Sequence, residues 1–176
     1  MSTLKVSTIS PLGTDATKTI TIGDLTNGDV AAGAFTNTPA FFVKLSSNQS
    51  IGNNSNTKVT FDSEVFDTDS AFASNKFTVP TGKGGKYFIG YGLNCSGLDD
   101  TESIQASIFK NGSTVNYGFA GQFSPASNQE IKFTASAVLD LSAADYIELY
   151  VQHFEGGSMD LNASNTFLTG YRLIGA

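Results

Sequence analysis

The stretch NKFTVPTGKGGKYFIGYGLNC, Asn75 to Cys95, decides the fold class of this chain. It begins as an extended run, stops at Pro80, which cannot donate to a β-ladder, and turns through the glycines of residues 82–85. Residues 86–95 then alternate with the period of two that places successive strand side chains on opposite faces. One predicted face is bulky and the other is bare at two positions, which suits close approach of another backbone or a bulky ring. The bulky set is Tyr87, Ile89, Tyr91, Leu93 and Cys95, and the opposite set is Phe88, Gly90, Gly92 and Asn94.

The composition of the 176-residue chain indicates one strand-rich domain with a short extra segment. Eighteen glycines favour turns and strands over helices, and 14 Phe and 6 Tyr supply core area in the absence of Trp. Ten Lys and Arg against 16 Asp and Glu give a net charge of −6. Because phosphate contacts need clustered Lys and Arg, we expect no nucleic-acid partner.

Segments for membrane insertion, secretion or disulfide pairing are not expected. No stretch approaches the roughly 20 apolar residues of a membrane helix. The residues after Met1 are polar, so we expect no cleaved secretory signal. The single Cys95 excludes an intramolecular disulfide, and its apolar strand favours a buried, inert thiol.

Period-two alternation continues from residue 39 to the carboxyl terminus, and no useful length shows helical spacing. Residues 50–57 are predicted to form a polar loop, and Asn111-Gly112 is predicted to form the tight turn of a hairpin over residues 103–121. Many short strands at regular turn spacing predict an all-β sandwich or jelly roll. The other expected strands cover residues 40–47, 58–67, 76–80, 86–95, 130–141, 145–154, 159–161 and 166–175.

Five pieces of residues 39–176 resemble, in order, the globular head of complement component 1q, a tumour-necrosis-factor-like jelly roll. They are PAFFVKLSS (39–47), KVTFDSEVFD with SNKFTVPTGKGGKYFIGYGL (58–93), IFKNGSTV (108–115), SAVLDLSAADYIELYV (136–151) and FLTGYRLI (167–174). The resemblance implies a jelly roll of about ten strands that assembles as a tight homotrimer. The sequence departs from the family in having Ala144 where a glycine is common and no collagen-like Gly-x-y stem.

A trimer would explain aromatic strands beside bare glycines, since a subunit would bury one sheet face internally and another against its copies. The alternative is a monomeric sandwich in which every aromatic side chain is core. Eight residues are predicted to lie in the trimer interface or the core: Tyr87, Phe88, Tyr91, Leu149, Val151, His153, Phe167 and Tyr171.

Residues 1–38 differ from the rest in having few aromatics and much Thr, Gly and Asp. They are predicted to form an extended arm that adds strands to a neighbour, the alternative being a flexible leader. Their opening, MSTLKV followed by PLGTDATKTITIG, resembles the amino-terminal segment of tail-fibre and other virion proteins of marine bacteriophages, particularly cyanophages. The residues predicted to dock on the particle are Leu4, Val6, Ile20 and Ile22.

Chemically active groups are sparse. The lone His153 is expected in the core or an interface, and a trimer-axis metal site built from three copies is the alternative. Asp62, Glu64, Asp67 and Asp69 form one acidic cluster, and Asp99, Asp100 and Glu102 form another. The complement-like family sometimes carries calcium, but neither cluster has EF-hand spacing, and solvated loop acids are the preferred interpretation. We expect no enzyme and no cofactor.

The leading functional hypothesis is a phage virion structural protein, as a tail fibre, spike or capsid decoration subunit. It would be made in the host cytoplasm and located in the virion, where the arm docks on other virion proteins and the trimeric head projects. Attachment to a host-surface glycan or protein would use the loops 46–57, 97–102, 119–129 and 155–165. Alternatives are a cellular adhesion or lectin-like module of the complement type and a hydrolase on a jelly roll.

Overall fold

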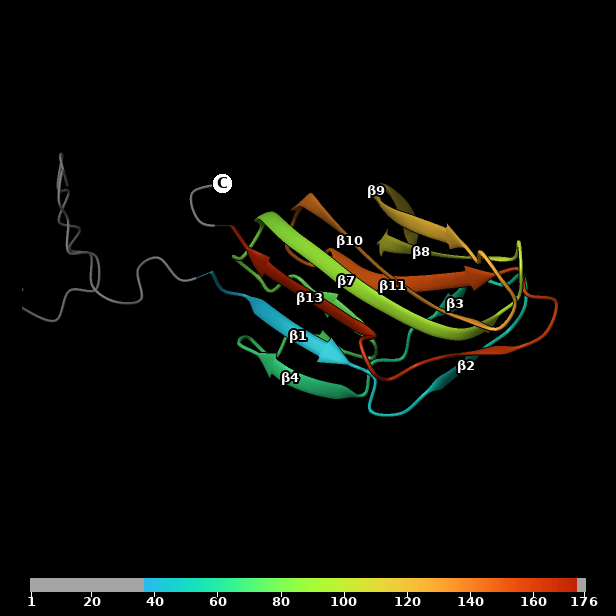
Figure 1. Ribbon diagram of the computed structural model, residues 1–176. Helices are drawn as coiled ribbons and strands as arrows, with labels where there is room; N and C mark the ends of the chain where they lie inside the picture. Colours follow the sequence, from blue (N-terminus) through green and yellow to red (C-terminus); the bar gives the residue numbers. More distant parts are fainter. Residues whose placement is uncertain (1–36, 174–176) are drawn as a thin grey trace, which may run out of the picture. The chain divides into compact units, whose positions relative to one another are not determined.

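The computed structural model describes residues 37–173, which form thirteen β-strands in two antiparallel sheets (Figure 1). The chain divides into two units, Met1–Ala34 and Phe35–Ala176, and the described residues all belong to the second. None of them forms a helix that could cross a bilayer. The all-β sandwich predicted from the alternation is therefore confirmed.

Sheet A contains seven strands in the order β2-β12-β7-β13-β1-β4, with β10 on the other side of β7. β12 and β13 pair with different parts of the same edge of β7, so the end strands of this sheet are β10, β2 and β4. The strands are β1 (Ala40–Lys44), β2 (Gln49–Ile51), β4 (Ser63–Asp67), β7 (Gly85–Leu98), β10 (Gln129–Leu141), β12 (Met159–Leu161) and β13 (Phe167–Arg172).

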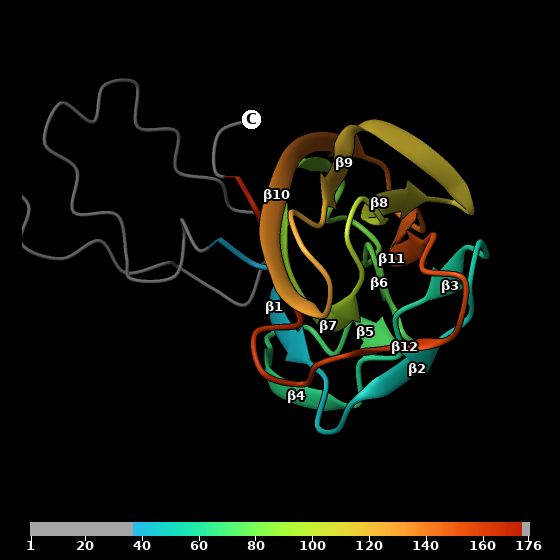
Figure 2. The ribbon, with the colours of Figure 1, turned by 45° about the vertical axis from the view of Figure 1, so that its right-hand side comes forward.

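Sheet B contains six strands in the order β5-β6-β11-β8-β9, with β3 also paired to β11. The rotated view in Figure 2 shows β10 and β1 on one side of the head and β8, β11 and β3 on the other. The strands are β3 (Thr57–Lys58), β5 (Phe72–Ala73), β6 (Lys76–Thr78), β8 (Ser103–Lys110), β9 (Ser113–Phe123) and β11 (Tyr146–His153).

The core lies between the sheets and is filled by the inward positions of both. The five bulky residues predicted for one face of β7 are all buried, with at most 1% of each exposed. From sheet B, the inward side chains of β8 and β11 meet them. Burying such aliphatic and aromatic side chains is the main favourable term in folding. The inward set of sheet B includes Ile104, Ala106, Ile108, Ile147, Leu149 and Val151.

The strand predicted over residues 58–67 is in fact two strands in different sheets. β3 pairs with β11 in sheet B, and β4 pairs with β1 in sheet A. Between them the chain crosses from one layer to the other while Val59 and Phe61 still point into the core, at 0% and 5% exposed. The period-two alternation of apolar side chains therefore continues through the crossing, so the sequence pattern alone does not show that the chain changes sheet.

The polar loop predicted over residues 50–57 was also wrong in part, because β2 occupies its start. Ile51 is buried and pairs with Met159, so this short strand covers one end of sheet A. A single apolar residue among Asn, Ser and Gly gives no period to recognise. Short strands such as β2, β3 and β5 raise the total above the ten that the resemblance implied.

Two turns at one end of the head depend on left-handed backbone conformations. Asn111 and Gly112 have φ of 52° and 78°, which confirms the predicted tight hairpin between β8 and β9. Ala144 has φ of 70°, and its N–H donates to the carbonyl of Val79 at 2.9 Å. Ala144, the position at which the sequence departs from the family it resembles, is therefore one where a Cβ is strained.

We predict that Ala144→Gly stabilises the protein by about 0.5 kcal/mol. Relief of left-handed strain is worth about 1 kcal/mol, and the greater entropy of glycine in the unfolded chain offsets part of it. Urea unfolding at a fixed protein concentration measures the change. Ala143→Gly is the control because φ at Ala143 is not positive, and this change should destabilise. Equal losses from both substitutions would contradict the strain assignment.

Candidate interaction surface

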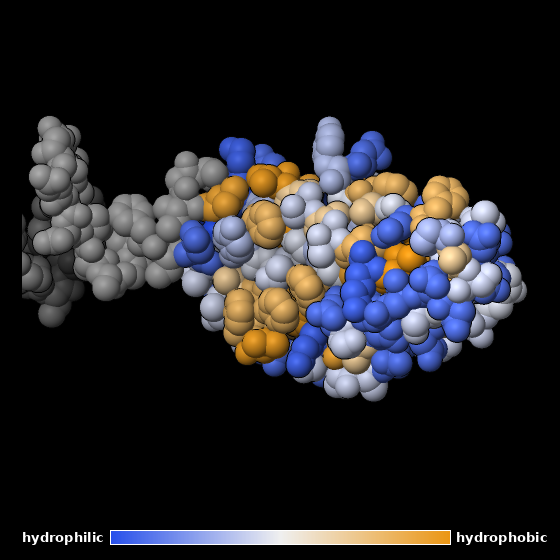
Figure 3. All heavy atoms as spheres, viewed as in Figure 1, coloured by the Kyte–Doolittle hydropathy of each residue, from blue (hydrophilic) through white to orange (hydrophobic). Residues whose placement is uncertain are grey.

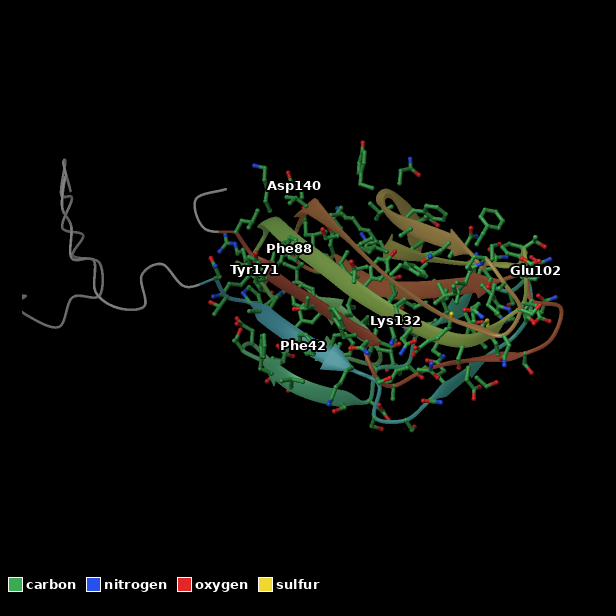
Figure 4. All side chains as sticks on the ribbon, viewed as in Figure 1. Phe42, Phe88, Glu102, Lys132, Asp140 and Tyr171 are labelled. Carbon is green, nitrogen blue, oxygen red and sulfur yellow. The ribbon has the colours of Figure 1, made fainter. Side chains whose placement is uncertain are left out.

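The outward face of sheet A carries aromatic rings on four adjoining strands, in two groups of ring contacts. The Phe42 ring lies 5.2 Å from the Phe167 ring and 6.3 Å from the Phe66 ring, between centroids. The Phe88 and Tyr171 rings are stacked at 5.2 Å. Figure 4 shows Phe42, Phe88 and Tyr171 on neighbouring strands. We call this set the aromatic face: Phe42 (β1), Phe66 (β4), Phe88 (β7), Phe167 and Tyr171 (β13).

The alternation of β7 builds the core with one set of residues and the aromatic face with the set between them. Tyr171 pairs with Phe88, and Phe167 pairs with Gly92, so each outward position of β13 lies beside an outward position of β7. A Cβ on Gly92 would overlap the Phe167 ring, and a Cβ on Gly90 would lie 3.0 Å from the Phe88 ring. The bare positions therefore accommodate bulky rings, one of the two alternatives that the sequence allowed, and the rings belong to this same chain.

A hollow of about 330 Å³ opens in sheet A beside these rings. Phe88 and Phe167 form its apolar walls, and the small polar side chains Thr134 and Ser136 of β10 and Thr169 of β13 lie around it. Its lining includes no Asp, Glu, His, Lys, Arg or Cys, and the hydroxyl of Tyr91, which also borders it, donates to the carbonyl of Ala106. It can therefore accept an apolar side chain or a small neutral group, and it offers no catalytic group.

Several side chains of this side of sheet A are open to solvent. Phe66 is 46% exposed, and Val138 of β10 is 56% exposed. Val65, which lies unpaired at the β1–β4 bulge beside Phe66, is 58% exposed. Figure 3 shows apolar side chains gathered over β1 and β4, whereas polar side chains cover the part of sheet A near β2. Contiguous exposed apolar surface of this kind marks an interaction site more often than a passive surface.

The eight residues predicted for interface or core separate into two groups. Phe88, Phe167 and Tyr171 lie on the aromatic face, half-buried. The other five are core residues with at most 1% exposed: Tyr87, Tyr91, Leu149, Val151 and His153. Burial raises the pKa of Tyr87 and of Tyr91 to about 12, so both hydroxyls stay protonated at neutral pH. The four predicted docking residues, Leu4, Val6, Ile20 and Ile22, lie outside the described residues.

His153 is held inside the sandwich by its own chain. Its Nε2 lies 3.1 Å from the carbonyl oxygen of Ile51, and its Nδ1 accepts from the N–H of Glu155 at 3.3 Å. Both ring nitrogens are thus engaged with backbone groups, and the side chain is 0% exposed. This geometry gives His153 a structural role in joining β11 to β2 and offers no free nitrogen for the alternative metal site.

Phe42, Phe66 and Val138 were missed as face residues by the sequence reasoning. Their alternation was visible in AFFVK, SEVFD and SAVLDL, but which phase of each strand points outward depends on the pairing partners. Phe42 pairs with Phe66, and Val138 pairs with Phe88, which fixes all three on one face. The sequence pattern does not show how strands that are distant in the chain are paired, and this pairing decides which side chains point outward.

The four loops predicted to bind a host surface are brought together at one end of the head. The Asp99 N–H donates to the Glu155 carboxylate at 2.8 Å, and the Gly156 N–H donates to Asn53 Oδ1 at 3.0 Å. The Ser124 N–H donates to the Glu102 carbonyl at 2.8 Å. Together these bonds link the four predicted loops to one another: residues 46–57, 97–102, 119–129 and 155–165.

Neither acidic cluster forms a metal site in the part of the chain that the structure describes, where no group of three or more His, Cys, Asp or Glu is placed to hold an ion. Asp62 accepts from the N–H and hydroxyl of Ser46, which holds the pKa of its carboxyl below the usual range. Asp67 accepts from the N–H of Phe72 at 2.7 Å. These carboxylates order their own loops, and calcium binding stays a prediction from the resemblance.

No family model matches this chain, and no curated protein matches it. The globular domain of the zebrafish complement 1qA protein superposes with a TM-score of 0.54 at 17% identity, covering 77% of this chain and 97% of that one. The fold is that of a complement 1q or tumour-necrosis-factor head. The Eiger TNF of S. frugiperda gives a TM-score of 0.53 at 15% identity, over 78% of this chain and 92% of its own. The jelly roll is thereby confirmed, and at these identities the likeness shows the fold alone.

Two glycine substitutions test whether the aromatic face is an open layer over a closed core. A Cβ at Gly170 would lie 2.7 Å from Ile89 Cδ1 and 2.9 Å from the Phe88 carbonyl oxygen, with no room to move. We predict that Gly170→Ala costs about 1–3 kcal/mol, as overpacked cores do. Gly92→Ala should cost less than about 1 kcal/mol, because the half-exposed Phe167 ring can rotate away. Urea unfolding of both variants checks this, and equal costs would contradict it.

Proposed function

We propose that this chain is the head module of a homotrimer, assembled through the aromatic face of sheet A. The observation that carries the proposal is the open aromatic face, where Phe66 is 46% exposed in a single copy and the adjoining Val138 of β10 is 56% exposed. The fold supports it, since the family that the sequence resembles assembles as homotrimers. Covering this surface with neighbouring copies removes apolar area from water, at about 25 cal/mol for each Å² buried.

In the proposed ring, the aromatic rings of one copy contact the β10 border of the next copy. On β10, Val138 lies on the same outward face as the rings and is exposed. Two different surfaces of one molecule that fit each other generate a heterologous contact, which closes into a ring when the rotation permits. Three copies are the number that the resemblance implies.

We further propose that the trimer is a structural component of a phage virion, as a tail fibre, spike or capsid decoration subunit. The support is the resemblance of residues 1–38 to the amino-terminal segments of marine phage virion proteins. In this proposal the arm docks on other virion proteins, and the head projects and contacts the host surface. In this proposal the head is a binding module, and the hollow in sheet A is lined mainly by apolar and small polar side chains.

The trimer is tested by placing a charge at Val138, which lies beside Phe88 of the aromatic face. We predict that the wild-type chain has a mass three times its own 18.5 kDa, and that Val138→Lys lowers the mass to that of a folded single copy. The reason is that an interface would bury an unpaired ammonium in each copy, which is costly. Light scattering after size-exclusion chromatography measures the mass, and circular dichroism checks folding.

Thr114→Lys is the matched control, since Thr114 is an exposed strand residue on sheet B, away from the aromatic face. It should leave the mass at three copies. A wild-type single copy, or a Val138→Lys variant that keeps the wild-type mass, would overturn the proposed assembly.

The virion role is tested separately with purified particles from a host that produces a tagged copy. We predict that the full chain is found in the particles, whereas a variant that lacks residues 1–38 forms the same oligomer and is absent from them. Absence of the full chain from particles would refute the virion role. Incorporation of the shortened chain would show that the arm is not the docking element.

A further inference from the structure

The outward face of sheet B carries a second group of exposed aromatic rings, on the edge strand β9. Register places Phe119 opposite Ser107, Gly121 opposite Gln105, and Phe123 opposite Ser103. Ile104, Ala106 and Ile108 of β8 point into the core, so the intervening β8 positions and their β9 partners point outward. We call this surface the β9 platform: Ser103, Gln105 and Ser107 of β8, and Phe119, Gly121 and Phe123 of β9.

Two phenyl rings of the β9 platform stand clear of the sheet with a bare position between them. Phe119 is 51% exposed and Phe123 is 72% exposed. They are four residues apart on one strand, so their Cα atoms lie about 13 Å apart. Gly121 lies between the two rings, where a Cβ would lie 3.2 Å from Gln105 Cβ. The absence of a side chain leaves the sheet surface between the rings uncovered.

An ordered chain of side-chain amides borders the β9 platform. Gln105 Nε2 donates to Gln152 Oε1 at 2.8 Å, and Gln152 Nε2 donates to Asn54 Oδ1 at 3.0 Å. These bonds fix the Gln105 amide, and within residues 37–173 its Oε1 accepts no hydrogen bond. It therefore offers a preorganised acceptor beside Gly121, with the Ser103 and Ser107 hydroxyls as further donors.

The β9 platform is uncharged. Strand β9 has no ionisable side chain other than Tyr117, and β8 has none before Lys110. Edge strands exposed to solvent usually carry Lys or another charge, which prevents edge-to-edge pairing. An 11-residue edge strand with exposed aromatic rings and no charge lacks that protection, which indicates a surface kept for binding.

We propose that the β9 platform binds a neutral polysaccharide of the host-cell surface, laid along β9 with sugar rings against Phe119 and Phe123. The apolar faces of sugar rings pack against phenyl rings, and their hydroxyls both donate to and accept from amides and serine hydroxyls. A surface without charge gives no advantage to an acidic or basic partner. The inference rests on the proposed function, since a trimer that buries sheet A leaves the opposite face of each sandwich open.

Affinity electrophoresis tests the proposal with the full-length protein. The native chain, with net charge −6, migrates toward the anode through gels that contain dextran, laminarin or galactomannan, with alginate as the charged comparison. At least one of the three neutral polymers is expected to retard the wild type, with no retardation by alginate. Phe119→Ala and Phe123→Ala are each expected to weaken retardation about tenfold, as loss of a ring contact predicts.

Gln122→Ala is the matched control, because Gln122 is exposed on the same strand but pairs with the inward-pointing Ile104. It should bind as the wild type does. All three altered side chains are partly or fully exposed, so the variants should fold, and circular dichroism confirms this before binding is measured.

The proposal is overturned if no neutral polymer retards the wild type, or if alginate retards it equally. It is also overturned if both phenylalanine substitutions leave binding unchanged, or if the wild type forms an assembly of more than three copies that Phe123→Ala dissociates. The last would show that the β9 platform binds a second copy. The mass of the same samples separates this test from that of the trimer. A single copy that is retarded contradicts the trimer and supports the platform, whereas a trimer that is not retarded contradicts the platform alone.

Discussion

Strand β7 is the element on which the rest of the structure depends, because its two faces are built for different purposes. The inward face carries five bulky residues that are almost fully buried, and the outward face carries two glycines under aromatic rings. A strand whose interior positions were bulky on both faces could not let Phe167 lie flat against sheet A. The core and the aromatic face are therefore consequences of one alternation.

The outward faces of the two sheets differ in chemistry. Sheet A presents stacked rings and a hollow over small residues, which fits a rigid apolar partner such as another copy. Sheet B presents separate rings between amides and hydroxyls, which fits a hydrated ligand. If both assignments hold, assembly and recognition use different sheets and do not compete, and each copy of the ring contributes its own β9 platform.

The sequence was sufficient for the fold class because strand alternation is local. It predicted the bulky face of β7 and the hairpin at Asn111-Gly112, and the family resemblance marked Ala144 as a position where glycine is common. It could not separate β3 from β4, since Val59 and Phe61 keep alternating while the chain changes sheets. It missed β2 because one buried Ile51 makes no pattern.

The positions of the interaction surfaces depend on the strand register, which cannot be read from the residue pattern of a single sequence. Whether Phe42 or Phe41 faces outward is decided by pairing with β13 and β4, from distant parts of the chain. The same holds for Phe119 and Gln105, whose neighbourhood follows from the β8–β9 pairing and from contacts with β11. Composition indicated aromatic surface in excess, and only the sheet topology divided it between core, aromatic face and β9 platform.

Hydroxyl-radical footprinting of the native protein tests the central claim most directly, which is that neighbouring copies bury the aromatic face. In a single copy Phe66 is 46% exposed and Phe123 is 72% exposed. The account predicts that Phe66 is protected from oxidation while Phe123 reacts at the rate of an open ring. Oxidation of Phe66 in proportion to its single-copy exposure would contradict burial of the aromatic face.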